Sequence, residues 1–323
     1  MIWLTWRQHR QQALFTLIGL AVLAALIVPI GLAMRHSSTA LGIPHCVKLM
    51  GDGAYLSSDF PDKCNNAISQ FTNQYNIVNM VGVLLLFVPM LIGLFWGAPL
   101  VSREIDEGTH RLVWTQGVSR GRWALVKFGL VGAFTLVLSI AYGLGVSWTM
   151  TPLSQVGISR FAYLSFDMQG IVPIGYTLFA VAVGVLAGTI WHKALPAMGA
   201  TIAVFIATRV TSALYARPHY MSPKVLTRPV LGPGAAELNP AHGDFRVHEA
   251  VRDAAGKIVQ DNAQVGCPPT VTKCGGVGKG AYNWMQYQPG GRFWAFQSIE
   301  TGIFIAIALL LIALAIRRVR RIS

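Results

Sequence analysis

The sequence predicts an all-α multi-pass membrane protein. It has six transmembrane helices, both termini in the cytoplasm, and a small irregular or β-containing extracytoplasmic insertion before the last helix. Hydrophobic residues make up 53% of the chain and charged residues only 12%, whereas about a quarter of a soluble domain is charged. Six apolar stretches reach the ~20 residues that a bilayer requires, and basic residues lie mostly between them. Much of the apolar surface must therefore face lipid.

The six predicted spans lie at roughly 13–34, 76–101, 122–148, 171–191, 195–215 and 298–316. The first resembles a signal peptide, because Arg7 and Arg10 precede its apolar core. No convincing cleavage site follows, so an uncleaved span is favoured. Three parts result: 1–215, with an N-terminal interfacial helix, five spans and the loop 102–123; the insertion 216–297; and 298–323, with the sixth span and a basic tail.

The placement of the basic residues predicts the orientation. A net charge of +13 would suit nucleic acid only if it formed a solvent-facing stripe, and no nucleic-acid partner is expected. The two short outer loops carry four basic residues: Arg35, Lys48, Lys63 and Arg160. The inner segments are richer, with Arg7, Arg10, Arg103, Arg111, Arg120, Arg122, Lys127, Lys193, Arg317, Arg318, Arg320 and Arg321. Basic residues favour the cytoplasmic side, so both termini are predicted to lie in the cytoplasm. The chain is therefore expected to be a multi-pass protein of the plasma (cytoplasmic) membrane.

The cysteines support the same topology. Cys46 and Cys64 fall in the first outer loop, and Cys267 and Cys274 in the last. Four cysteines permit three pairings, of which Cys46–Cys64 with Cys267–Cys274 requires the least rearrangement. Disulfides belong to an oxidising compartment. The alternatives are free thiols or a zinc site, which the absence of a CxxC spacing disfavours.

The insertion 216–297 contains one clear β signal and an aromatic cluster. FRVHEAV and KIVQ alternate apolar and polar residues around a turn at Arg252–Gly256, which predicts a hairpin. The aromatics before the last span are Tyr282, Trp284, Tyr287, Trp294 and Phe296. They are interpreted as an interfacial belt, with a platform that stacks carbohydrate or drug rings as the alternative.

The sequence gives little sign of catalysis. It contains no GxxxxGK[ST] phosphate loop and no HExxH metalloprotease motif. The histidines show no paired ligand spacing on one helix. The chain is therefore not expected to be an enzyme or to bind a metal, and no cofactor is expected in it.

The loop from Ser102 to Trp123 is the most informative segment. Acidic residues come first and Arg111 follows, an order that suits a short helix dipole. Ile105, Leu112 and Val113 share one helical face. Ser119 can cap the helix leading into the third span. Such a helix can receive movement from a soluble partner; the alternative is an ordinary charged loop.

This loop resembles the signature of type-2 ABC exporter permeases. The matching residues are Arg103-Glu104, Glu107-Gly108-Thr109, Val118-Ser119-Arg120 and Lys127, with Gly117 where proline is usual. The six-span plan is similar too. The opening MIWLTWRQHRQQ and the closing YQPGGRFWAFQSIETGIF resemble an actinobacterial subgroup of such permeases.

The resemblance implies a function and partners. The chain would be the permease of an ABC transporter that exports an amphipathic or lipid-like compound or drug. ATP and Mg²⁺ would bind a separate ATPase subunit, and a second permease chain would complete a homo- or heterodimer in the bilayer. The ATPase contacts would be Arg103, Glu104, Asp106, Glu107, Gly108, Thr109, Arg111, Leu112 and Trp114. The alternative is a membrane-anchored extracytoplasmic binding or sensory protein that does not transport.

Two features inside the spans complete the predictions. Arg209 in the fifth span and Glu300 at the start of the sixth are expected to form a buried ion pair, with substrate contact as the alternative. Ala180, Gly184 and Gly188 recur every fourth residue, which predicts close helix packing.

Overall fold

The computed structural model describes residues 2–50, 61–108, 119–156, 159–191, 193–232, 235, 237–238, 243–267 and 276–321. Within these residues, six helical segments are long and apolar enough to cross a membrane. They cover Arg10–Ala40, Asn76–Asp106, Arg120–Val156, Val172–Ile190, Ala194–His219 and Gly290–Arg321. The predicted number of spans and their order are confirmed.

Three of the spans are single α-helices, and the others contain irregular turns. The first, third and fourth are α1 (Ile2–Ala40), α8 (Arg120–Val156) and α10 (Val172–Ile190). The segment expected at the membrane surface is helical and continuous with the first span. The second comprises α4 (Asn76–Leu85), α5 (Val88–Ile92), the π-helix η2 (Gly93–Gly97) and α6 (Pro99–Asp106). The fifth comprises α11 (Ala194–Thr211), η3 (Ser212–Ala216) and η4 (Arg217–His219), and the sixth η5 (Gly290–Arg292) and α12 (Phe293–Arg321).

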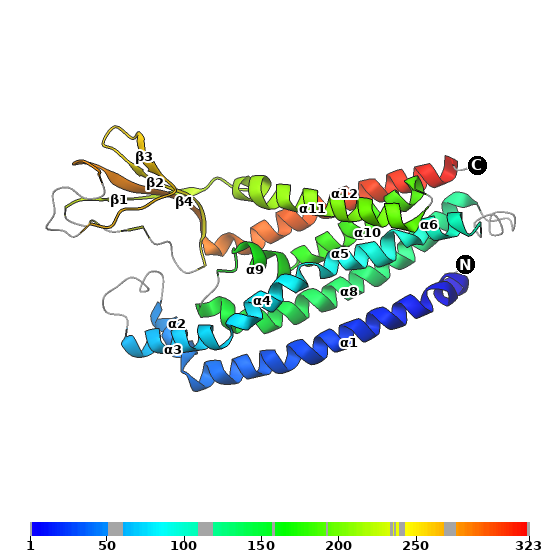
Figure 1. Ribbon diagram of the computed structural model, residues 1–323, viewed down its shortest axis with the longest axis horizontal. Coiled ribbons are helices and arrows are strands. Elements are labelled where there is room, and N and C mark those ends of the chain that lie inside the picture. The colour runs from blue at the N-terminus through cyan, green and yellow to red at the C-terminus, as the bar shows by residue number, and fades with distance from the viewer. Residues whose placement is uncertain are drawn as a thin grey trace.

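The two ends of the helix bundle differ in what they carry (Figure 1). Both termini and the end of α6 lie at one end, here called the terminal end. The short helices α2 (Ile43–Met50) and α3 (Asp62–Gln74) lie at the other end with the sheet. This end is called the sheet end. An even number of spans produces this arrangement.

Helix α10 forms the centre of the bundle and is the most deeply buried span. Its predicted small-residue stripe packs against the second span. A Cβ added to Gly184 would lie 2.6 Å from the Ala98 backbone nitrogen, and one added to Gly188 would lie 2.6 Å from the Ala98 carbonyl oxygen. Only residues without bulky side chains allow two backbones to approach this closely.

The segment between the first and second spans is held by a disulfide. Cys46 of α2 is bonded to Cys64 of α3, as predicted. Phe71 and Ile43 are fully buried beside this bridge. Cys267 is also in a disulfide, and Cys274 lies outside the described residues.

The insertion before α12 contains a four-stranded antiparallel sheet. The strands are β1 (Lys224–Pro229), β2 (Phe245–Arg252), β3 (Ile258–Asp261) and β4 (Tyr282–Gln288), in the order β1-β4-β2-β3. The predicted hairpin is β2–β3, and its turn contains Gly256 at φ +83°, a conformation that favours glycine.

The interpretation of the aromatic cluster as one interfacial belt was wrong. Tyr282, Trp284 and Tyr287 belong to β4 and are part of the sheet. Trp284 lies beneath the Arg252 guanidinium, with 3.9 Å from Cζ to the ring centroid. Phe296 is fully buried in α12, and Trp294 alone of the five is largely exposed. Trp294 and Phe296 are two positions apart on α12, so they point to different sides of that helix.

Candidate functional site

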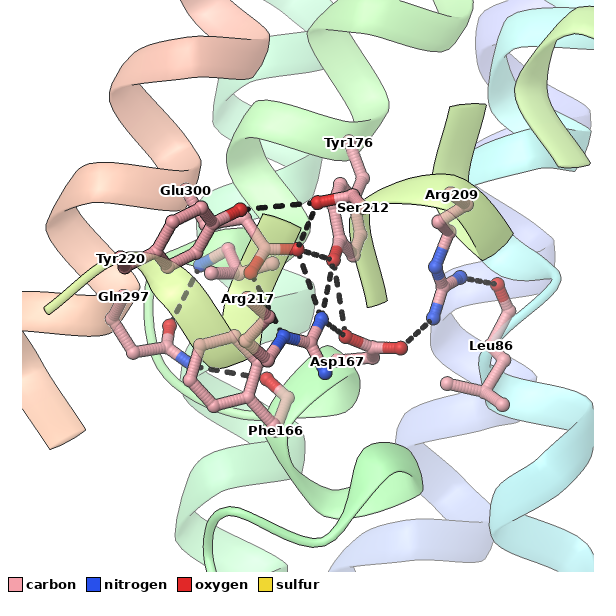
Figure 2. Close-up of polar contacts among 11 residues, drawn as sticks. Leu86, Phe166, Asp167, Tyr176, Arg209, Ser212, Arg217, Tyr220, Gln297 and Glu300 are labelled. Carbon is pink, nitrogen blue, oxygen red and sulfur yellow. Dashed lines mark hydrogen bonds and ion pairs between the residues drawn. The ribbon is translucent and has the colours of Figure 1, made fainter. Parts of the chain in front are cut away.

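A buried polar cluster joins α10 and the fifth and sixth spans to the short helix that precedes α10 (Figure 2). Its charged members are Asp167 of α9 (Tyr163–Met168), Arg209 of α11, Arg217 of η4 and Glu300 of α12. We call these four side chains the outer cluster. Two carboxylates face two guanidinium groups, so the formal charges cancel.

Arg217 is the centre of the outer cluster. Its side chain is 0% exposed. Nη2 lies 2.5 Å from Asp167 Oδ1 and 2.9 Å from Glu300 Oε1, and Nε donates to Glu300 Oε2 at 2.9 Å. The Phe166 ring lies 4.1 Å from Arg217 Cζ. Paired and hydrogen-bonded in this way, a guanidinium can be buried without an uncompensated charge.

The predicted Arg209–Glu300 pair was wrong in its partners. Arg209 Nη2 donates to Asp167 Oδ2 at 2.5 Å, and Glu300 pairs with Arg217. Sequence reasoning missed Asp167 and Arg217 because both lie in short segments beyond the ends of apolar runs. Arg209 thus pairs with Asp167 and Glu300 with Arg217, and not with each other.

Hydroxyl groups complete the outer cluster. Tyr176 Oη lies 2.5 Å from Glu300 Oε1 and 3.0 Å from Asp167 Oδ1, and its one proton can be donated to either carboxylate. Burial and the neighbouring Glu300 carboxylate raise the pKa of Tyr220 to about 12. Tyr220 therefore keeps its proton. Its hydroxyl lies 3.1 Å from Ser212 Oγ. Ser212 in turn donates to Glu300 Oε1 at 3.2 Å.

Gln297 fixes the turn between α9 and α10. Its Oε1 accepts the backbone N–H groups of Ile171 and Val172 at 3.0 and 2.9 Å, and its Nε2 donates to the Phe166 carbonyl at 2.9 Å. This side chain and Glu300 are on the same helix, so α12 holds both α9 and the start of α10. The outer cluster can therefore join four segments into one unit.

At the terminal end, a second buried ion pair joins α6 to α8. Glu104 Oε1 pairs with Lys127 Nζ, and both side chains are almost fully buried. The Trp123 ring lies 5.2 Å from Lys127 Nζ. The expectation that Glu104 faces a partner protein was therefore wrong: Glu104 follows α6 into the interior, where Lys127 compensates its charge.

The other residues predicted for ATPase contact fall into two groups. Arg103, Asp106 and Glu107 are exposed, and Gly108 has φ +67° directly after the helix. Thr109, Arg111, Leu112 and Trp114 lie outside the described residues. The predicted cap is present, since Ser119 Oγ accepts the Arg122 N–H at 3.4 Å. The sequence suggested that the acids begin a short helix. They lie instead at the C-terminal end of α6.

A groove of about 580 Å³ runs between α1, the second span and α11. Its walls are mainly apolar, with Phe15 and Leu20 from α1 and Phe95 from η2. Gln12 and Arg103 line it near the terminal end. Trp96 also lines it and donates Nε1–H to Thr16 Oγ1 at 3.0 Å. The groove is therefore apolar over most of its walls and polar near the terminal end.

These features define a multi-pass membrane protein with buried charge clusters at both ends of its helix bundle and an apolar groove between spans. A sequence model described as "ABC-2 membrane transporter related" matches residues 17–217. That is more than half of the chain, and the chain belongs to this family. The match confirms the resemblance to ABC-2 permeases; the subgroup stays a prediction. Comparison with curated proteins and with solved structures found no match.

Proposed function

We propose that this chain is the permease subunit of an ABC exporter and that a separate ATPase subunit binds at the end of α6. The observation that carries the proposal is the placement of Asp106 and Glu107. Both are exposed carboxylates at the C-terminal end of a helix, where the helix dipole disfavours negative charge. Folding does not explain them, whereas a basic surface on a partner protein does.

The end of α6 that carries these acids is fixed to two further spans. The Glu104–Lys127 pair ties α6 to α8 one turn inside the exposed end. Ser102 donates to the Ala98 carbonyl at 2.9 Å, and Ala98 packs against Gly184 and Gly188 of α10. A push on the end of α6 would therefore reach two further spans.

The distribution of charge and the disulfide support a cytoplasmic location for the terminal end. Arg10, Arg120 and Arg122 and the arginines of the α12 tail lie at the terminal end, and the Cys46–Cys64 bridge lies at the sheet end. Basic residues favour the cytoplasmic side, and disulfides form in an oxidising compartment. The proposed ATPase site would then face the cytoplasm.

The groove supports an amphipathic or lipid-like substrate. Its apolar walls suit an alkyl or aromatic body, and Gln12 and Arg103 suit a polar headgroup near the cytoplasmic surface. Much of α1 and α11 exposes apolar side chains, among them Phe15, Leu195 and Val210. In the proposed transporter, lipid and a second permease chain cover these faces.

Purification of the tagged chain from native membrane tests the proposal. We expect a protein with a phosphate-binding loop to co-purify and the complex to hydrolyse ATP. Recovery of the chain without any ATP-hydrolysing protein, in a detergent that preserves the fold, would contradict the proposal. It would favour an extracytoplasmic binding or sensory role for the sheet.

A further inference from the structure

The second span is interrupted between α4 and α5. Helix α4 ends at Leu85 and α5 begins at Val88. The turn between them is tight, since Leu86 and Phe87 donate their N–H groups to the carbonyls of Val83 and Leu84, both at 3.2 Å. The span therefore consists of an outer part, α4, and an inner part, α5–η2–α6.

Pro89 explains why the backbone changes here. In a continuous helix the N–H of residue 89 would bind the carbonyl of Leu85, but proline has no N–H. A carbonyl left without a donor inside a bilayer is strongly unfavourable, because no water is there to bind it. Tyr142 of α8 supplies the missing donor: its hydroxyl binds the Leu85 carbonyl at 2.8 Å, and its side chain is buried.

The next carbonyl ties the interruption to the outer cluster. Arg209 Nη1 donates to the Leu86 carbonyl at 3.3 Å while Nη2 donates to Asp167 at 2.5 Å (Figure 2). One guanidinium thus joins the turn in the second span to the charges that hold α9, η4 and α12. The bond to Leu86 is the longer of the two.

The inner part of the span is packed more tightly than the turn. The π-helix η2 brings Gly93 and Gly97 against α10, where a Cβ on either would lie 2.5 Å from atoms of Ala180 or Val181. Further along, Glu104 pairs with Lys127. Sliding of the inner part against α10 is therefore restricted, and the turn at Leu86–Phe87 is the place where the direction of the span can change.

We propose that Leu86–Phe87 is a hinge between α4 and the inner part of the second span, with Tyr142 as the positioning residue that satisfies the carbonyl opened by Pro89. A swing of α4 at this hinge would change the Arg209–Leu86 contact and so reach the outer cluster. The role in export rests on the proposed function; the hydrogen-bonding relationship between Pro89, Leu85 and Tyr142 does not.

Substitutions at positions 89 and 142 test the hydrogen-bonding part. Tyr142→Phe should lower the thermal unfolding midpoint of the purified protein by about 2–4 °C. Pro89→Gly restores an N–H at position 89, so in that background Tyr142→Phe should lower the midpoint much less. The exposed Tyr163→Phe is the matched control and should leave it unchanged. Equal losses from Tyr142→Phe in both backgrounds would overturn the relationship.

The hinge itself is tested by comparing two replacements of Pro89. Both alanine and glycine return the N–H, but alanine favours a continuous helix and glycine keeps the backbone pliable. We expect Pro89→Gly to retain most ATP-dependent export and Pro89→Ala to lose most of it, with both recovered as folded protein. Export by Pro89→Ala at the wild-type rate would overturn the hinge. Absence of export from the wild type would instead reject the proposed function and leave the unfolding comparison valid.

Discussion

Glu104 and Lys127 form an ion pair inside the helix bundle, 23 residues apart along the chain and on opposite sides of the segment that joins the second and third spans. The pair fixes α6 against α8 immediately below the exposed end of α6. Glu104 therefore holds the end of α6 in place, while Asp106 and Glu107 remain exposed and available to a partner.

Breaking the Glu104–Lys127 pair should destabilise the protein. Glu104→Gln or Lys127→Met leaves one buried group without its partner, at a cost of about 3–5 kcal/mol. The double replacement Glu104→Leu with Lys127→Leu removes both charges and should cost much less. Unfolding of the purified variants in a double-mutant cycle measures the coupling; additive losses would show that the pair contributes no stability of its own.

The outer cluster gives a test that discriminates between two pairings. Exchanging charges between Arg217 and Glu300 should restore part of the stability lost in each single charge reversal, because these two groups are in direct contact. The same exchange between Arg209 and Glu300 should restore little. Equal recovery in both exchanges would contradict the contacts described for Asp167 and Arg217.

Close packing of α10 against the second span makes Gly184 sensitive to substitution. Gly184→Val would force the backbones apart, since even a Cβ would lie 2.6 Å from the Ala98 nitrogen. We expect a loss of about 1–3 kcal/mol, the usual cost of overpacking. Gly132 is the matched control, because a Cβ there meets no atom within 4 Å. Similar losses at both positions would show that helix propensity and not packing determines the effect.

The Cys46–Cys64 bridge should stabilise the sheet end. It closes a loop with a sequence separation of 18 residues, for which the loss of chain entropy in the unfolded state predicts about 3 kcal/mol. Replacing both cysteines by serine should lower the unfolding free energy by that amount. In intact cells, an impermeant thiol reagent should label Cys46 and Cys64 only after reduction. Labelling without reduction would contradict the bridge.

The sequence was sufficient for the architecture because lipid imposes a simple rule. Twenty apolar residues must become a span, and the periods of FRVHEAV and KIVQ specify a hairpin. The small residues of α10 also predicted their own close contact. These features depend on residues close together in the chain or on the bilayer. Predicting them does not require knowing which span packs against which.

The charge partners could not be predicted in the same way. Arg209 and Glu300 were recognised as intramembrane charges, but their partners depend on how α9 and η4 fold back on the bundle. Glu104 looked like a surface acid because its neighbours Asp106 and Glu107 are. Glu104 lies on the side of α6 that faces Lys127, whereas Asp106 and Glu107 are exposed. That difference depends on how α6 packs against α8, which the sequence does not reveal.

Reversal of the exposed acids at the end of α6 tests whether an ATPase subunit binds there. Asp106→Lys with Glu107→Lys places positive charge at a helix C-terminus, which favours the helix, so folded yield should be unchanged. Asp261→Lys, at an exposed acid of β3 at the sheet end, is the control. We expect the double variant, and not the control, to lose both the co-purifying ATPase and export. A double variant that retains its ATPase and exports at the wild-type rate would show that the end of α6 is not the ATPase-binding site.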